Sequence, residues 1–169
     1  MIPPKPEEYA PMMGNYIKLV ADAPDIINAL EQQNTAVFDL FNNLTEEKAM
    51  YAYGPDKWTL KQVIGHLIDA ERTFAYRAYA FSRGQNELPG FDENTYVERG
   101  GFNTRSIQDL AAEFKAVRIS NLYFIRALSA EQLTTVAISN NIPTSVRALV
   151  YVMAGHVQHH LNIVNERYF

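Results

Sequence analysis

Apolar residues recur at intervals of three and four positions in four long stretches of the chain. This spacing is typical of a helix that buries one face, whereas a half-buried strand alternates apolar and polar residues. The stretches span residues 22–44, 59–84, 106–128 and 144–167. Since no part of the chain shows the alternation of a strand, the pattern predicts an all-α protein built as a four-helix bundle.

Residues near the start of three stretches mark helix N-termini. Proline is tolerated in the first helical turn, so the first helix is expected to begin around Pro24. Thr59 and Gln62 have the spacing of a capping box, in which each side chain accepts a hydrogen bond from the backbone of the other residue. Thr144, directly after a proline, is expected to open the fourth helix.

The connections between the stretches predict how the helices are ordered. Residues 85–105 contain two turn-forming pairs, Pro89-Gly90 and Gly100-Gly101, and have no regular pattern. This stretch is long for a connection within a compact domain. It can span the bundle from end to end, so we expect the second and third helices to run parallel. Shorter turns are expected at residues 45–48 and 129–133.

The chain length of 169 residues fits a single domain, residues 1–169, that can bury a sizeable core. Residues 1–15 carry four prolines and little periodicity, so they are expected to form an extended N-terminal arm. These residues lack the basic start and apolar run of a signal peptide.

Three of the four histidines, His156, His159 and His160, lie within five positions, and the fourth is His66. Residues i and i+4 share one helix face, with Cβ atoms about 5–6 Å apart. His156 and His160 can therefore direct two imidazole nitrogens at one divalent ion, as in the H-E-x-x-H motif. A third ligand must come from another element, and His66 is the remaining histidine outside this helix.

The positions around each helix separate these histidines. At about 100° per residue, His160 lies about 40° from the centre of the apolar stripe of its helix, and His156 about 80° to the same side. His159 lies about 140° away, so it should face solvent or a subunit interface. His66 lies about 90° from its own stripe. The alternative is that the histidines are structural and make hydrogen bonds within the packing of the bundle.

Composition and charge exclude several classes of function. The net charge is −4 and no lysine or arginine cluster occurs, so nucleic acid is not an expected partner. The chain has no cysteine, which excludes disulfides, zinc–thiolate sites and a protein thiol nucleophile, and a cytoplasmic location is expected. The longest nearly apolar run, residues 148–157, is about half of a membrane span, so no membrane association is expected.

Four segments together resemble the DinB-like (YfiT-like) superfamily. They are residues 57–59 (Lys-Trp-Thr), 66–71 (His-Leu-Ile-Asp-Ala-Glu), 88–93 (Leu-Pro-Gly-Phe-Asp-Glu) and 155–161 (Gly-His-Val-Gln-His-His-Leu). The resemblance implies a four-helix bundle of up-down-down-up order with a long connection between helices two and three. It also implies one divalent cation on His66, His156 and His160, and a homodimer.

The resemblance further implies a metal-dependent enzyme with a small-molecule substrate. Several members transfer low-molecular-weight thiols, and others are described as metal-dependent hydrolases. The expected activity is therefore that of a thiol S-transferase, with a hydrolase as the alternative. Zinc or nickel suits imidazole ligands, and a thiol cosubstrate would come from outside this cysteine-free chain. A third hypothesis is that the protein is a non-catalytic dimeric bundle whose histidines are structural.

Three further features near the candidate site each have two interpretations. Glu71 lies about 50° from the centre of the apolar stripe of its helix. It either orients a histidine ligand or acts as a general base, or it forms a buried ion pair with an arginine such as Arg72, Arg77 or Arg147. We favour the buried pair. Residues 91–96 either cover the site or pack over a bundle end, and Trp58 is expected as a hydrophobic staple rather than a substrate contact.

Overall fold

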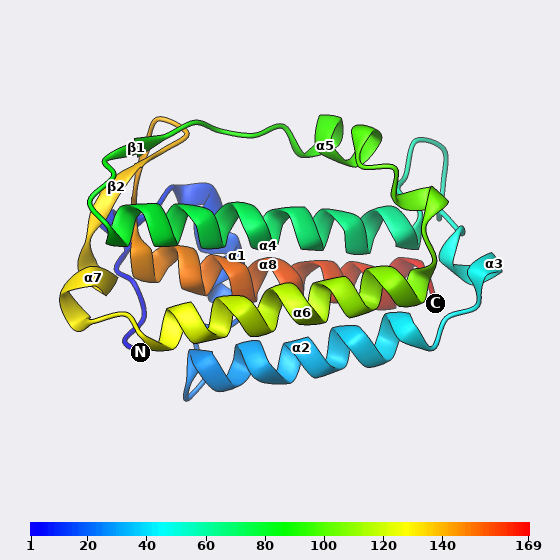
Figure 1. Ribbon diagram of the computed structural model, residues 1–169, viewed down its shortest axis with the longest axis horizontal. Coiled ribbons are helices and arrows are strands. Elements are labelled where there is room, and N and C mark those ends of the chain that lie inside the picture. Colours follow the sequence, from blue (N-terminus) through cyan, green and yellow to red (C-terminus); the bar gives the residue numbers. More distant parts are fainter.

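Four long helices form the bundle in the computed structural model, which describes residues 1–169. They are α2 (Ile26–Asn42), α4 (Leu60–Ser82), α6 (Ile107–Arg126) and α8 (Val146–Arg167). The helices form a ring in which α2 packs on α6, α6 on α4, α4 on α8 and α8 on α2. In Figure 1, α2 and α8 run in one direction and α4 and α6 in the other. The predicted up-down-down-up order is confirmed.

Polar side chains at the N-termini determine where the helices begin. The capping box of Thr59 and Gln62 is present at the start of α4, as predicted. The first helix begins two residues after Pro24, because Asp25 accepts the capping hydrogen bond. The prediction for Thr144 was wrong: Ser145 caps α8, and Thr144 belongs to a strand.

A small sheet lies at one end of the bundle beside α7 (Ala130–Thr134), as Figure 1 shows. Its strands are β1 (Glu87–Leu88), β2 (Val136–Ser139) and β3 (Ile142–Ser145). β1 pairs parallel with β2, and β2 pairs antiparallel with β3. Asn140 and Asn141, which connect β2 and β3, have φ angles of 53° and 63°. Asparagine tolerates this left-handed conformation, so the pair closes a tight hairpin that the helical pattern did not predict.

The connection from α4 to α6 runs back along the length of the bundle (Figure 1). It is less irregular than expected, since it contains α5 (Glu93–Arg99) and the 3-10 turn η3 (Phe102–Thr104). Asp92 caps α5 by accepting hydrogen bonds from the backbone of Asn94 and Thr95. The turn expected at residues 45–48 is the short helix α3 (Glu46–Ala49).

The N-terminal residues do not form an extended arm, so that expectation was wrong. They form two 3-10 turns, η1 (Pro6–Glu8) and η2 (Pro11–Met13), followed by α1 (Gly14–Lys18), which packs on α8. Glu8 accepts hydrogen bonds of 2.7 Å from Ser145 Oγ and from Arg147 Nε. Proline favours turns as well as extended chain, and contacts with the distant helix α8 select the turns.

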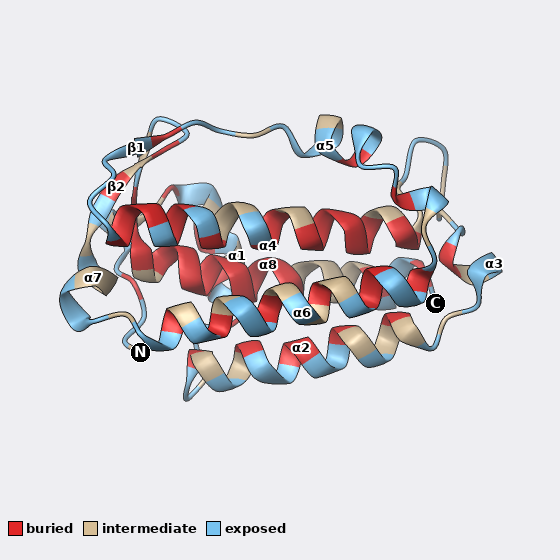
Figure 2. Cartoon of the chain, viewed as in Figure 1, coloured by how far each residue is buried: buried red, intermediate tan, exposed pale blue.

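Burial is concentrated on the two helices that carry the candidate ligands. Figure 2 shows α4 and the first half of α8 buried over most of their surface, whereas α2 and α6 each expose one face. None of the helices combines the length with the apolar composition that a membrane span requires.

Candidate metal centre

Three histidines from two antiparallel helices converge on one point. The Nε2 atom of His66, on α4, lies 2.9 Å from that of His156, on α8. The Nε2 atom of His160, one turn further along α8, lies 3.2 Å from the same His156 atom. One ring nitrogen from each of the three residues lies within 4.8 Å of the other two. The structure therefore brings together the three residues selected from the sequence.

The chemistry of imidazole indicates what this arrangement suits. An imidazole Nε2 carries either one hydrogen or one lone pair, so His156 Nε2 can form a hydrogen bond with one of its two neighbours but not with both. A shared cation accepts a lone pair from all three nitrogens at once. Two nitrogens bound tetrahedrally to zinc at about 2.0–2.1 Å lie roughly 3.3 Å apart, close to the 2.9 and 3.2 Å that separate His156 Nε2 from its two neighbours. The donor set therefore fits one divalent cation.

Burial keeps these imidazoles neutral. It lowers the pKa of His66 to about 4, with a further contribution from the charge of His159. Burial, followed by the charges of His66 and His159, lowers the pKa of His160 to about 3. The pKa of His156 lies well below its ordinary value, chiefly because of burial. At neutral pH the lone pairs are available to a metal, which is the protonation state that ligation requires.

Aromatic rings surround the histidines. Trp58 lies with its ring centroid 4.9 Å from that of His66, while also packing against the core as expected for a staple. Phe74 and Tyr16 approach His156 edge to face, at 5.7 and 5.4 Å between centroids. These rings exclude water from one side of the site and fix the planes of the imidazoles.

A glycine precedes a candidate ligand in each helix. A Cβ atom on Gly65 would overlap the ring of Phe102, and one on Gly155 would overlap the backbone of Tyr16. The missing side chains let η3 pack closely on α4 and α1 on α8. Sequence reasoning missed Tyr16, since it belongs to a segment whose position depends on this long-range contact.

A pocket of about 270 Å³ opens beside His160. Its lining includes Trp58, Tyr53 and Tyr168 as aromatic walls, and Lys57 and Asn94 as polar groups. Asn94 comes from α5, so the segment 91–96 borders the site rather than packing only over a bundle end. The pocket gives a small molecule access to one ligand of the candidate centre.

His159 lies outside the cluster of three. Its ring contacts Tyr16 edge to face at 5.3 Å between centroids, and the residue is half-buried. It was expected to face solvent or a subunit interface, and α1 instead covers part of it.

Glu71 is held in a buried ion pair, not at the histidines. Its two carboxylate oxygens accept hydrogen bonds of 2.6 and 2.8 Å from Arg118, and Asn121 donates a third of 3.1 Å. The predicted buried ion pair with an arginine is present, but its partner is not one of the three arginines that were named. Arg118 lies four residues from Phe114 and from Leu122, on the apolar stripe of its helix, and this spacing would have revealed it.

The up-down-down-up bundle and the histidine positions define the class of protein. The model of the DinB superfamily matches residues 29–164, and the chain belongs to this superfamily. Among solved structures, YfiT from Bacillus subtilis has the same fold, with a TM-score of 0.75 and 16% sequence identity over 96% of this chain and 89% of YfiT. YfiT is described as a probable metal-dependent hydrolase with an unusual four-helix bundle topology. Comparison with curated proteins gives no match.

Proposed function

We propose that this protein is a metal-dependent enzyme whose divalent cation is held by His66, His156 and His160. The observation that carries the proposal is the meeting of three neutral, largely buried Nε2 atoms beside a pocket that a small molecule can enter. Buried polar atoms normally have hydrogen-bond partners, and three converging nitrogens cannot all satisfy one another. A structural role for the histidines leaves this arrangement unexplained.

A divalent cation with three imidazole ligands keeps exchangeable coordination positions and lowers the pKa of a water or thiol that ligates it. Zinc and nickel are the ions we propose, since both accept imidazole nitrogen. The protein residues bind and orient the reactants. Trp58 was expected as a staple only, but it also lines the pocket, and with Tyr53 it would provide apolar walls for a substrate. Lys57 and Asn94 would offer donors to the polar groups of the substrate.

Hydrolysis, with water as the nucleophile, is the reaction we favour, and the description of YfiT supports it. Transfer of a low-molecular-weight thiol is the alternative that the family resemblance suggests. The chain has no cysteine, so the thiol would be a cosubstrate that enters through the pocket beside His160.

Metal analysis of protein purified without an affinity tag tests the cation site. We expect about one equivalent of zinc or nickel in the wild type after dialysis against the ion, and its loss in His66→Ala and His156→Ala. His159→Ala is the matched control, because this neighbouring histidine lies outside the cluster, and it should retain the metal. Absence of metal from the wild type, or loss in His159→Ala alone, would contradict the proposal.

The metal-loaded protein then separates the two reactions. Hydrolysis of p-nitrophenyl acetate without added thiol, abolished in His156→Ala, would support water as the nucleophile. Consumption of monobromobimane with added bacillithiol or mycothiol, at a rate above the uncatalysed alkylation and lost in His156→Ala, would support transfer. A bound metal with neither activity would leave the cation site in place and reject both of these substrate classes.

A further inference from the structure

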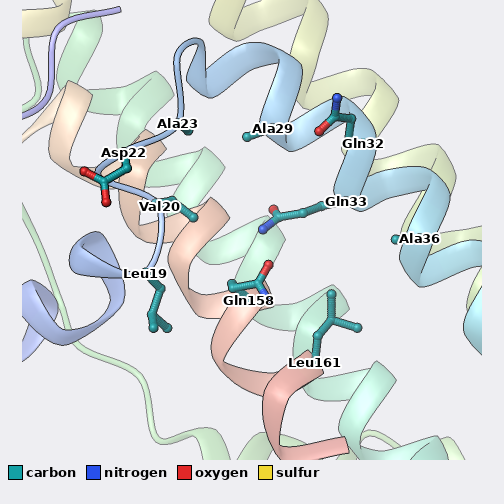
Figure 3. A pocket seen from close by; sticks show the side chains of 10 residues that line it. All are labelled: Leu19, Val20, Asp22, Ala23, Ala29, Gln32, Gln33, Ala36, Gln158 and Leu161. Carbon is teal, nitrogen blue, oxygen red and sulfur yellow. The ribbon is translucent and has the colours of Figure 1, made fainter. Parts of the chain in front are cut away.

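Hollows at the surface of the bundle differ in whether a buried charge faces them. A groove of about 400 Å³ between α2 and α8 is lined largely by short or apolar side chains, including Ala29, Ala36 and Leu161 (Figure 3). Asp22 is its only charged residue, and it is exposed. A smaller pocket of about 190 Å³ lies between α4 and residues 88–96, and the side chain of Arg77 lines it. A buried charge therefore faces the smaller pocket and not the groove.

The fold buries two arginines, and only one of them has a counter-ion. Arg118 is 0% exposed and is paired with Glu71, whereas Arg77 is 5% exposed and forms no ion pair. Burial lowers the pKa of Arg77, while Tyr96 acts in the opposite direction. A guanidinium nevertheless stays charged in proteins, and a buried charge without a partner is costly. Arg77 is therefore a buried cation without a counter-ion in the chain.

Arg77 keeps hydrogen-bond donors that a ligand can reach. Its Nη2 donates a hydrogen bond of 2.7 Å to the carbonyl oxygen of Pro89, and the guanidinium lies 5.7 Å from the ring centroid of Phe91. These contacts fix the position of the group. Nε and Nη1 donate no hydrogen bond within the protein, and both remain accessible to water. Since a guanidinium carries five N–H groups, at least one edge with two parallel donors is free for a ligand.

The lining of the pocket indicates which anion is complementary. No acidic residue and no second lysine, arginine or histidine lines it, so the site balances one negative charge. The planar edge of a guanidinium matches a carboxylate, which accepts two parallel hydrogen bonds. Leu88, Pro89 and Phe91 form apolar walls around the remaining space. These features suit a monoanion with a short apolar body rather than a phosphate dianion.

We propose that this pocket binds a small monocarboxylate. Its carboxylate accepts two hydrogen bonds from Arg77, and its alkyl chain replaces water along Leu88 and Phe91. The pocket shares no lining residue with the one beside His160, so the site is independent of the proposed function.

Titration of the protein with butyrate, followed by two-dimensional NMR of backbone amides and arginine Nε–H groups, tests this site. We expect shifts at Arg77, Phe91 and Tyr96, and no binding of butyramide, which has a similar shape without the charge. Arg77→Met removes the guanidinium and should weaken binding at least tenfold. Arg83→Met is the matched control, because it removes an exposed arginine at the end of α4 that does not line the pocket, and it should bind as the wild type does.

Thr73→Leu provides a second variant, which places a larger side chain in the pocket and leaves Arg77 unchanged. It should abolish binding, and it decides the question if Arg77→Met does not fold, which circular dichroism establishes. His156→Ala should still bind butyrate, because its carboxylate does not act as a ligand of the cation at the candidate metal centre. Absence of binding to the wild type, retention of binding in Thr73→Leu, loss of binding in His156→Ala, or tighter binding of butyramide or inorganic phosphate would overturn the proposal.

Discussion

His66, His156 and His160 each lose part of their basicity on folding, because burial disfavours the imidazolium form. An unfolded chain exposes these side chains and restores a pKa of about 6.5. Between this value and the folded pKa of about 4 for His66, the unfolded state binds more protons than the folded state. Stability therefore rises with pH across this window and is lost as the pH falls through it.

We expect the cation-free protein to lose stability from about pH 6.5 down to about pH 4, by up to roughly 1.4 kcal/mol per pH unit for each histidine. Urea unfolding in the presence of a chelator, at a series of pH values, measures this slope. A variant with His66→Gln should show a shallower slope in the same window. Equal slopes for the two proteins would contradict the assignment of the effect to His66.

Single and double substitutions at the buried Glu71–Arg118 pair should differ greatly in their effect on the free energy of unfolding. Glu71→Ala leaves a fully buried guanidinium without its partner and should lower the free energy of unfolding by about 3–5 kcal/mol. Glu71→Leu combined with Arg118→Met removes both charges and should recover most of this loss. Denaturant unfolding measures both effects. Glu31→Ala, which breaks an exposed pair with Arg126, is the control and should cost less than about 1 kcal/mol.

At the level of elements, α1 is placed by its close approach to α8 at Gly155. Alanine normally stabilises a helix relative to glycine by about 1 kcal/mol. At this position its Cβ atom would overlap the backbone of Tyr16, and no side-chain rotation relieves that overlap.

We therefore expect Gly155→Ala to lower the melting temperature despite its better helix propensity, with a net loss of about 1–3 kcal/mol. The displaced α1 should also weaken cation binding, since Tyr16 packs on His156. Calorimetry of unfolding and of zinc binding measures the two effects. Gly54→Ala is the control, because its Cβ atom would meet only ordinary contacts. A more stable Gly155→Ala protein would show that the contact is dispensable.

The sequence predicted those elements whose signal is local. Periodic apolar positions located the four helices, and i,i+4 spacing with a helical wheel selected the three histidines. The hairpin at Asn140 and the position of Tyr16 were not predicted, because both depend on contacts between residues far apart in the chain. Arg118 was not predicted although the same periodicity places it on an apolar stripe, because a charged side chain is rarely buried without a partner and its partner, Glu71, lies 47 residues away in the chain.

At the level of the whole molecule, the candidate cation site connects helices that are remote in sequence. His66 and His156 are separated by 90 residues, and the unfolded chain does not hold them together. A ligand that binds only the folded state stabilises it, by about 2.7 kcal/mol at one hundred times its dissociation constant. Loading with zinc should therefore raise the melting temperature by about 5–11 °C. Differential scanning calorimetry measures the shift, which should vanish in His156→Ala and persist in His159→Ala.

The packing of α4 on α8 also has a consequence for synthesis of the chain. At about 5–20 residues per second, the ribosome completes the His156 region roughly 5–18 s after the His66 region, which lies 90 residues earlier. Until then α4, with its extensive apolar surface, has no α8 to cover it. Nascent chains in this state expose the kind of surface that chaperones bind. A circular permutation that starts the chain at α8 would make α8 before α4, so that α4 would find its partner already synthesised.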